Sequence, residues 1–210
     1  MPPPTEPLEV AAVILAAGAS RRMGPGRNKM LLRLEGESLV HRAARRAAGA
    51  GLAPVVVVLG AEAERVRAEL ADLPCDLALN PDFTGPTSGS LHRGLERIPA
   101  AVGAAVVMLA DMVLVTEPML AAVVATSRGS DAPLVVSRYG EVTAPPLLFR
   151  RALFGELLAW TGEGCGKTVV QRHRGEAAFV DWPHAALTDI DTPDDFAAAE
   201  ALIARHNTPM

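Results

Sequence analysis

The sequence is poor in aromatic residues and in cysteine. Aromatic side chains make up 4% of the 210 residues, so the core must be built from alanine, valine, leucine and isoleucine. Such small aliphatic residues suit a parallel sheet that is buried on both faces by helices. The two cysteines, Cys75 and Cys165, have no metal-ligand spacing. We interpret them as the reduced thiols of a cytoplasmic protein.

The chain also lacks a cationic surface and a long apolar run. Its formal net charge is −4, which argues against nucleic acid as a partner, because that binding depends on cations that neutralise phosphates. The Pro-rich, acidic start does not resemble a signal peptide, and no apolar stretch reaches the ~18 residues of a membrane span. We therefore expect no membrane partner, a flexible N-terminal segment over residues 1–9 and a single domain over residues 10–206.

Aliphatic runs alternate along the chain with stretches of helical periodicity. Strands are predicted at residues 11–17, 54–60, 76–80, 104–110, 132–137 and 177–182. Helices are predicted at residues 39–50, 62–71, 90–98, 119–127, 152–160 and 194–206. This order predicts an α/β fold, a Rossmann-like three-layer α/β/α sandwich with a mostly parallel sheet. Ligands of such sheets bind beyond the carboxyl ends of the strands.

The first predicted strand leads into a loop that is suited to a phosphorylated ligand. Residues 15–24 read Leu-Ala-Ala-Gly-Ala-Ser-Arg-Arg-Met-Gly, and Lys29 follows. Gly18 and Gly24 allow a tight turn whose amides form an anion-binding concavity. Arg22 and Lys29 add full positive charge for triphosphate oxygens. The alternative is an ordinary turn between a strand and a helix.

Two better-known phosphate loops are absent. The dinucleotide fingerprint Gly-x-Gly-x-x-Gly does not occur after the first strand. A later run, residues 162–168, lacks the first glycine of a Walker loop, where the chain has Thr161, and it follows a predicted helix rather than a strand. The loop after the first strand is therefore the stronger candidate for binding a nucleotide.

Aspartates supply the candidate metal ligands. Asp111 follows the fourth predicted strand, where it can bind Mg²⁺ beside the triphosphate loop. Asp189 and Asp191 lie two residues apart, so an extended backbone would point both to one side. The alternatives are that Asp111 caps the next helix and that Asp189 orders a turn before the helix start at Thr192 and Pro193.

The motif Leu-Ala-Ala-Gly-x-Ser-x-Arg-Met-Gly followed by Lys resembles the signature of the nucleotidyltransferase superfamily, which includes sugar-phosphate and molybdopterin nucleotidyltransferases. Residues 80–95 and 189–195 are most similar to the molybdenum cofactor cytidylyltransferases. The resemblance implies a fold of the nucleotide-diphospho-sugar transferase type. It also implies catalytic roles for Arg22, Lys29 and Asp111, with Asp191 as a second ligand of Mg²⁺. The implied nucleotide-binding residues are Leu15, Ala16, Ala17, Gly18, Ser20, Arg22, Lys29, Asn80, Ser88, Gly89 and Ser90.

The acceptor half departs from the molybdopterin pattern. Val113 stands where that branch has proline, and Ala144 stands where it has a polar side chain. On the same resemblance, Pro145, Glu163 and Lys167 would contact the acceptor. The predicted reaction is transfer of CMP from CTP to a phosphorylated acceptor, with molybdopterin as one candidate and pyrophosphate as the product.

Two alternatives stay open. The enzyme could transfer a guanylyl or other nucleotidyl group to a different phosphorylated acceptor. The chain could instead be a non-catalytic nucleotide-binding accessory protein of a molybdenum enzyme.

Overall fold

A seven-stranded sheet runs through the centre of the computed structural model, which describes residues 8–206. The strand order is β5-β4-β1-β6-β8-β7-β9, and all strands are parallel except β8, which is antiparallel to β6 and β7. The strands are β1 (Val10–Ala16), β4 (Val55–Leu59), β5 (Cys75–Leu79), β6 (Ala104–Leu109), β7 (Leu134–Tyr139), β8 (Val142–Arg150) and β9 (Ala178–Trp182).

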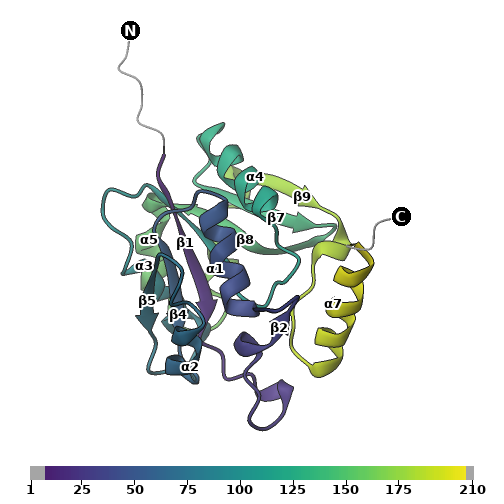
Figure 1. Cartoon of the computed structure of the whole chain (residues 1–210). Coiled ribbons are helices and arrows are strands. Elements are labelled where there is room, and N and C mark those ends of the chain that lie inside the picture. The colour runs from purple at the N-terminus through teal and green to yellow at the C-terminus, as the bar shows by residue number, and fades with distance from the viewer. Residues whose placement is uncertain (1–7, 207–210) are drawn as a thin grey trace.

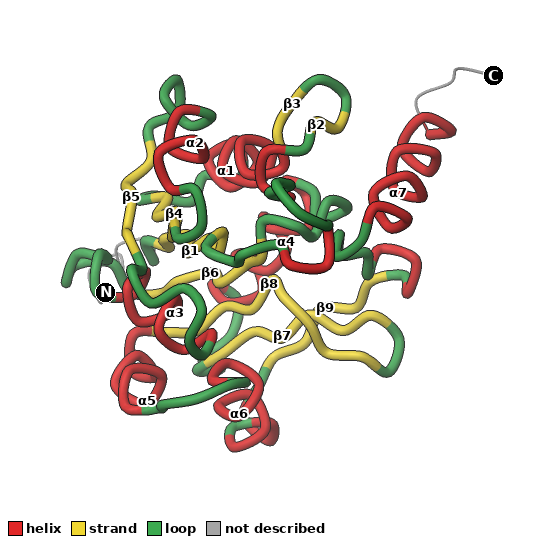
Figure 2. Tube along the Cα trace, turned by 90° about the horizontal axis from the view of Figure 1, so that it is seen from below, coloured by secondary structure: helices red, strands yellow, loops and turns green. Residues whose placement is uncertain are grey.

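Helices cover both faces of this sheet (Figure 2). One face packs against α1 (Leu39–Gly49), α2 (Ala63–Ala68) and α4 (Glu117–Arg128). The other packs against α3 (Thr87–Leu95), α5 (Phe154–Ala159) and α6 (Cys165–Arg172). The predicted three-layer α/β/α sandwich with a mostly parallel sheet is confirmed, and its aliphatic core is continuous on both faces because β1 and β4 are buried on both sides.

A third, smaller core lies beside the sheet. It joins α7 (Pro193–His206) to the hairpin of β2 (Arg33–Leu34) and β3 (Glu37–Ser38), through Leu34, Ile190 and Ile203 among others. Figure 1 shows α7 standing at one edge of the molecule, next to β2. Short 3-10 turns occupy Arg21–Met23, Lys29–Leu31, Arg151–Leu153, Arg174–Glu176 and His184–Ala186.

Besides the short hairpin of β2 and β3 and the 3-10 turns, two elements were not predicted. Strand β8 carries Pro145 and Pro146, and prolines normally argue against a strand inside a sheet. The prolines are accommodated because the pairing of β8 with β6 ends at Leu147 and its register with β7 shifts in the same region. Helix α6 begins directly after Gly164, within a glycine-containing run that resembles a loop.

The start of the described structure lies inside the segment that was predicted to be flexible. Residues 1–7 of the predicted flexible segment lie outside the described residues, whereas Leu8 and Glu9 are held to the domain. Arg128 donates to the Leu8 carbonyl at 3.1 Å, and the Gly103 amide donates to the Glu9 carbonyl at 3.1 Å. Within residues 8–206, no helix combines the length and apolar character that crossing a membrane requires.

Gly94 sets the distance between α3 and the sheet. A Cβ atom at this position would overlap with Cγ1 of Val13 and would lie 3.1 Å from Cγ2 of Val58. We predict that Gly94→Ala lowers the free energy of unfolding by about 1–3 kcal/mol, because the core has no room for another methyl group. Gly155→Ala is the matched control, because Gly155 is an exposed helical glycine with open space around it, and it should stabilise by about 0.5–1 kcal/mol. Urea denaturation measures both, and equal values for the two variants would contradict the prediction.

Candidate active site

Asn28 fixes the shape of the loop that follows β1. Its side chain is buried, its Nδ2 donates to the Ala61 carbonyl at 3.1 Å, and its Oδ1 accepts from the Met30 amide at 3.0 Å. Ser20 adopts a left-handed backbone with φ of 52°, and its hydroxyl accepts from the Lys29 amide at 3.0 Å. Hydrogen bonds therefore hold the loop together and fasten it to the segment after β4. These contacts direct Lys29 toward the rim of the sheet. Sequence reasoning missed Asn28, although an asparagine that precedes a short helical turn is a recognisable cap.

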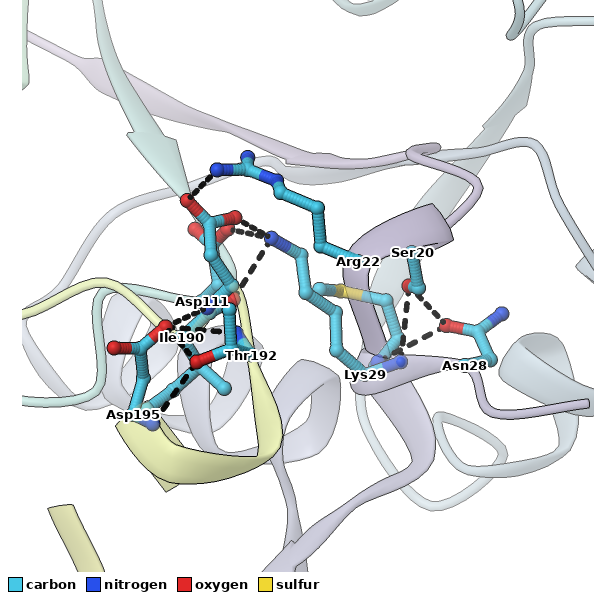
Figure 3. Close-up of polar contacts among 10 residues, drawn as sticks. Ser20, Arg22, Asn28, Lys29, Asp111, Ile190, Thr192 and Asp195 are labelled. Atoms are coloured by element: carbon cyan, nitrogen blue, oxygen red, sulfur yellow. Dashed lines mark hydrogen bonds and ion pairs between the residues drawn. The ribbon is translucent and has the colours of Figure 1, made fainter. Parts of the chain in front are cut away.

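Lys29 lies at the centre of a group of charged side chains (Figure 3). Its Nζ donates to Oδ2 of Asp111 at 2.5 Å, to Oδ1 of Asp191 at 3.0 Å and to the Ile190 carbonyl at 2.9 Å. Arg22 completes the group, because its Nη1 lies 2.8 Å from Oδ2 of Asp191. The structure thus brings the two predicted cations and the two predicted aspartates together at one rim of the sheet.

Burial makes this charge group electrostatically strong. The side chains of Lys29 and Asp111 are each 13% exposed, whereas that of Arg22 is 70% exposed. Burial alone would lower the pKa of Lys29, but Asp111 and Asp191 outweigh it, so the pKa is raised and the ammonium stays charged. Burial raises the pKa of Asp111, and the Lys29 ammonium opposes this shift without cancelling it. Arg22 is the solvent-exposed member of the group.

The two aspartates fit a divalent cation. Oδ1 of Asp111 is buried and has no hydrogen-bond partner, and such an atom can serve as a metal ligand. Within residues 8–206, no group of three or more His, Cys, Asp and Glu side chains could hold a metal ion. Mg²⁺ does not require such a group, because it commonly uses one or two carboxylates together with waters and substrate phosphates. Asp111 and Asp191 are therefore suited to Mg²⁺ that arrives with a triphosphate.

Two adjoining hollows open around Lys29. One, of about 310 Å³, is polar and is lined by the loop after β1 together with Asp191, including Gly18, Ser20, Arg22 and Lys29. The other, of about 190 Å³, lies at the end of β1 and includes Leu15, Ala16, Ala17, Gly18, Lys29, Ser90 and Asp111. Phe83 lines both and was not singled out from the sequence. The predicted nucleotide loop therefore lines both hollows, and Ser90 and Asp111 line the smaller one.

Three other predicted nucleotide-binding residues lie apart from these hollows. Asn80, Ser88 and Gly89 line a separate depression on the flank of α3. The Asn80 side chain donates to Oγ of Ser90 at 2.9 Å, and Oγ of Ser88 accepts from the Gly162 amide at 3.1 Å. These contacts hold the start of α3 in place, so in this structure the residues support the wall of the site.

The residues predicted for the acceptor separate into two groups. Pro145 and Lys167 line a third cavity, of about 290 Å³, beside the smaller of the two hollows. Glu163 instead binds the start of α3, where its Oε2 accepts from Oγ1 of Thr87 at 2.5 Å. The loop between α5 and α6 is therefore fastened to α3 by Glu163. The run at residues 162–168 follows a helix, as its sequence predicted, and not a strand.

Asp195 orders the segment that carries Asp191. Its Oδ2 accepts from the amides of Asp191 and Thr192 at 3.1 and 2.7 Å and from Oγ1 of Thr192 at 2.8 Å. The Asp195 amide in turn donates to Oγ1 of Thr192 at 3.2 Å. These reciprocal bonds resemble a capping box at the start of α7. This capping role of Asp195 was not predicted from the sequence.

We predict that Asp195→Ala lowers the melting temperature and reduces Mg²⁺-dependent activity about tenfold, because residues that orient metal ligands commonly contribute 10- to 100-fold. The matched control is Asp194→Ala, which removes a neighbouring exposed carboxylate outside the capping bonds. A differential scan and a Mg²⁺ titration of the turnover rate measure both effects. Equal activities of the two variants would show that Asp195 does not position Asp191.

A mostly parallel sheet whose first strand leads into a glycine-containing cationic loop, at the same rim as two aspartates, is typical of a nucleotidyltransferase-type protein. The chain belongs to the family of MobA-like NTP transferase domains, whose pattern matches residues 12–177.

Individual relatives agree with this assignment. The chain is 31% identical to the bifunctional protein GlmU of Anaeromyxobacter sp. strain Fw109-5 over 150 residues. This alignment covers 67% of the chain and 31% of the relative. The chain therefore spans about a third of the length of that relative. The crystal structure of an Rv0371c homologue from Mycobacterium sp. strain JC1 superposes with a TM-score of 0.82 at 26% identity, covering 94% of this chain and 98% of the other.

A further crystal structure bears on the metal. It contains Rv0371c of Mycobacterium tuberculosis H37Rv in complex with manganese. It superposes with a TM-score of 0.78 at 26% identity, covering 92% of this chain and 98% of the other. A protein of similar fold thus binds a divalent cation, which is consistent with divalent metal use in this family.

Proposed function

We propose that the protein transfers an NMP group, with CMP favoured, from an NTP·Mg²⁺ complex to the phosphate of a small acceptor. The observation that carries the proposal is the convergence of Lys29, Arg22, Asp111 and Asp191 at one rim of the sheet, where Lys29 lines both adjoining hollows. This arrangement offers cations for a triphosphate and carboxylates for its metal. The family supports nucleotidyl transfer, and the resemblance makes molybdopterin one candidate acceptor.

The proposed reaction is an in-line displacement at the α-phosphorus. An ionised phosphate oxygen of the acceptor forms the new bond, the bond from the α-phosphorus to the bridging oxygen breaks, and pyrophosphate leaves with the electron pair. No general base is needed, because the attacking oxygen carries no proton. Arg22 binds phosphate oxygens, the Lys29 ammonium adds a fixed positive charge beside them, and both stabilise charge on the leaving group. Asp111 and Asp191 would hold Mg²⁺, which would supply further charge neutralisation.

The exposed Arg22 is suited to exchange partners when the substrate binds. Its guanidinium has a single ion pair within the described residues, with Asp191, and its side chain is largely in solvent. An arriving triphosphate can therefore replace this partner at small cost. Lys29 is buried and bonded three times, so it acts as the fixed cation of the pair.

The preference for cytidylyl transfer rests on resemblance. Ala17 in place of glycine is similar to the cytidylyl branch of the superfamily. The hollow beside Leu15, Ala16 and Ala17 is the space that we assign to the base.

The test is a thermal-shift panel of the four NTPs with and without Mg²⁺, followed by pyrophosphate detection with phosphorylated acceptors that include molybdopterin. We expect CTP with Mg²⁺ to give the largest shift, because a ligand at a hundred times its dissociation constant stabilises by about 2.7 kcal/mol. Stabilisation without turnover of any acceptor would favour the nucleotide-binding accessory protein. The absence of stabilisation by any NTP would contradict the proposal.

A further inference from the structure

The cavity of about 290 Å³ that includes Pro145 and Lys167 has almost entirely apolar walls. It lies between the sheet and helices α3 and α6, at the edge of one of the two large cores. Its size is close to the lower limit of small-molecule sites, which is roughly 300 Å³. Its apolar walls are formed mainly by Leu91, Val107, Leu109, Leu147, Phe149 and Val170.

This cavity adjoins the space that we assign to the nucleotide. Leu15, Thr87 and Leu109 line both the cavity and the hollow at the end of β1. Leu15 is half-buried while the other residues of β1 are buried, and Leu109 is likewise the one residue of β6 that is not buried. Two leucines at the rim therefore face space where a core would normally bury them, and they connect the nucleotide side to the apolar cavity.

A single cation lies among the residues that line the cavity. Among these described residues, Lys167 carries the only charge. Its side chain is exposed, and within residues 8–206 it makes no ion pair of the kind that Lys29 makes. Glu163, the nearby carboxylate in sequence, is engaged by Thr87. The lining thus combines one available positive charge with an apolar interior, and it offers few partners for the hydroxyl groups of a sugar.

We propose that the acceptor of the nucleotidyl group is a phosphate ester with an apolar body, such as an alkyl, prenyl or aryl phosphate. This inference rests on the proposed function and names the substrate class of that site. The apolar body occupies the cavity, Lys167 attracts the phosphate as it enters, and the phosphate reaches the nucleotide side past Leu15 and Leu109. The reaction is the one proposed above. The ionised phosphate oxygen of the acceptor forms the bond to the α-phosphorus, and pyrophosphate leaves with the electron pair of the broken bond.

Gly166 offers a way to fill this cavity. A Cβ atom at Gly166 would lie 3.8 Å from Cζ of Phe149 and 3.9 Å from Cδ1 of Leu147, which are ordinary contact distances. Gly166→Leu therefore directs a side chain toward the cavity walls, and its Cβ atom meets them without overlap. Gly155→Leu is the matched control, because it makes the same change in an exposed helical position with open space around it.

The experiment measures binding by isothermal titration calorimetry at two temperatures. The probes are hexyl phosphate and glycerol 3-phosphate, each added to the protein alone and to its complex with Mg²⁺ and α,β-methylene-CTP. We expect hexyl phosphate to bind at least tenfold more tightly than glycerol 3-phosphate, with a more negative heat-capacity change, because that change reports burial of apolar surface. Gly166→Leu should weaken hexyl phosphate at least tenfold, whereas Gly155→Leu should not. Lys167→Met should weaken both probes by a similar factor.

Each other outcome overturns the inference. Equal or tighter binding of glycerol 3-phosphate would show that the acceptor is polar, and no binding of hexyl phosphate would show that the cavity does not take an apolar body. Unchanged binding of hexyl phosphate to folded Gly166→Leu would place the ligand elsewhere. Failure of the nucleotide analogue to bind would instead contradict the proposed function, and the titrations without nucleotide would still decide the question of the acceptor.

Discussion

Lys29→Met should lower the free energy of unfolding by about 3–5 kcal/mol, the cost of leaving a buried charge unpaired. The change removes three hydrogen bonds at once and leaves Asp111 buried beside Asp191 without a cation between them. Transferase activity should fall at least a hundredfold, because a fixed donor to developing negative charge is commonly worth 10²–10³ in rate. Denaturant unfolding and pyrophosphate release measure the two effects.

Lys167→Met is the control for stability. Lys167 is exposed, and exposed substitutions away from special features usually change stability by less than about 0.5 kcal/mol. Mg²⁺ should restore part of the stability of Lys29→Met, because a divalent cation can replace the ammonium between the two carboxylates. A Lys29→Met protein as stable and as active as the parent would contradict the role of this residue at the centre of the site.

Asp111→Asn should reduce activity at least a hundredfold and should abolish the effect of Mg²⁺ on the melting temperature measured with CTP. The reason is that asparagine keeps the size of the side chain but removes the negative charge that pairs with Lys29 and that suits Mg²⁺. The variant also tests stability, because it leaves the buried ammonium of Lys29 with Asp191 as its one carboxylate partner.

Asp189→Asn is the matched control for Asp111→Asn. Asp189 is exposed and close enough to influence the pKa of Asp111, so the control removes one negative charge from the same region and keeps both carboxylates that contact Lys29. We expect its activity and its response to Mg²⁺ to stay within a few fold of the parent. If the two variants lost activity equally, the loss would come from the change in negative charge near the site and not from removal of a metal ligand.

Much of the fold follows from short-range patterns. Continuous aliphatic runs predicted the strands on the nucleotide side because strands buried on both faces must be apolar at every position. The position of Asp111 directly after such a run placed it at the carboxyl rim, and the structure brings it to Lys29. The role of Asp191 was predicted from the family resemblance, because its local sequence does not distinguish a metal ligand from an ordinary helix start.

The missed features depend on contacts between distant parts of the chain. Pro145 and Pro146 argue locally against a strand, and β8 forms because its register with β7 shifts next to them. Glu163 has the chemistry of an acceptor ligand, yet it binds Thr87, which is 76 residues away in sequence. Asn28 likewise depends on the Ala61 carbonyl. Local periodicity cannot show which distant backbone group will be within reach of a side chain.

The position of Asp191 in the chain has a consequence for how the site is assembled. All seven strands of the sheet end by Trp182, and Asp191 follows in the segment that leads into α7. Residues of the central sheet and its loops supply the pair of Lys29 and Asp111. The second carboxylate of Lys29, which is also the one ion-pair partner of Arg22 within the described residues, depends instead on the segment that α7 anchors through its small core.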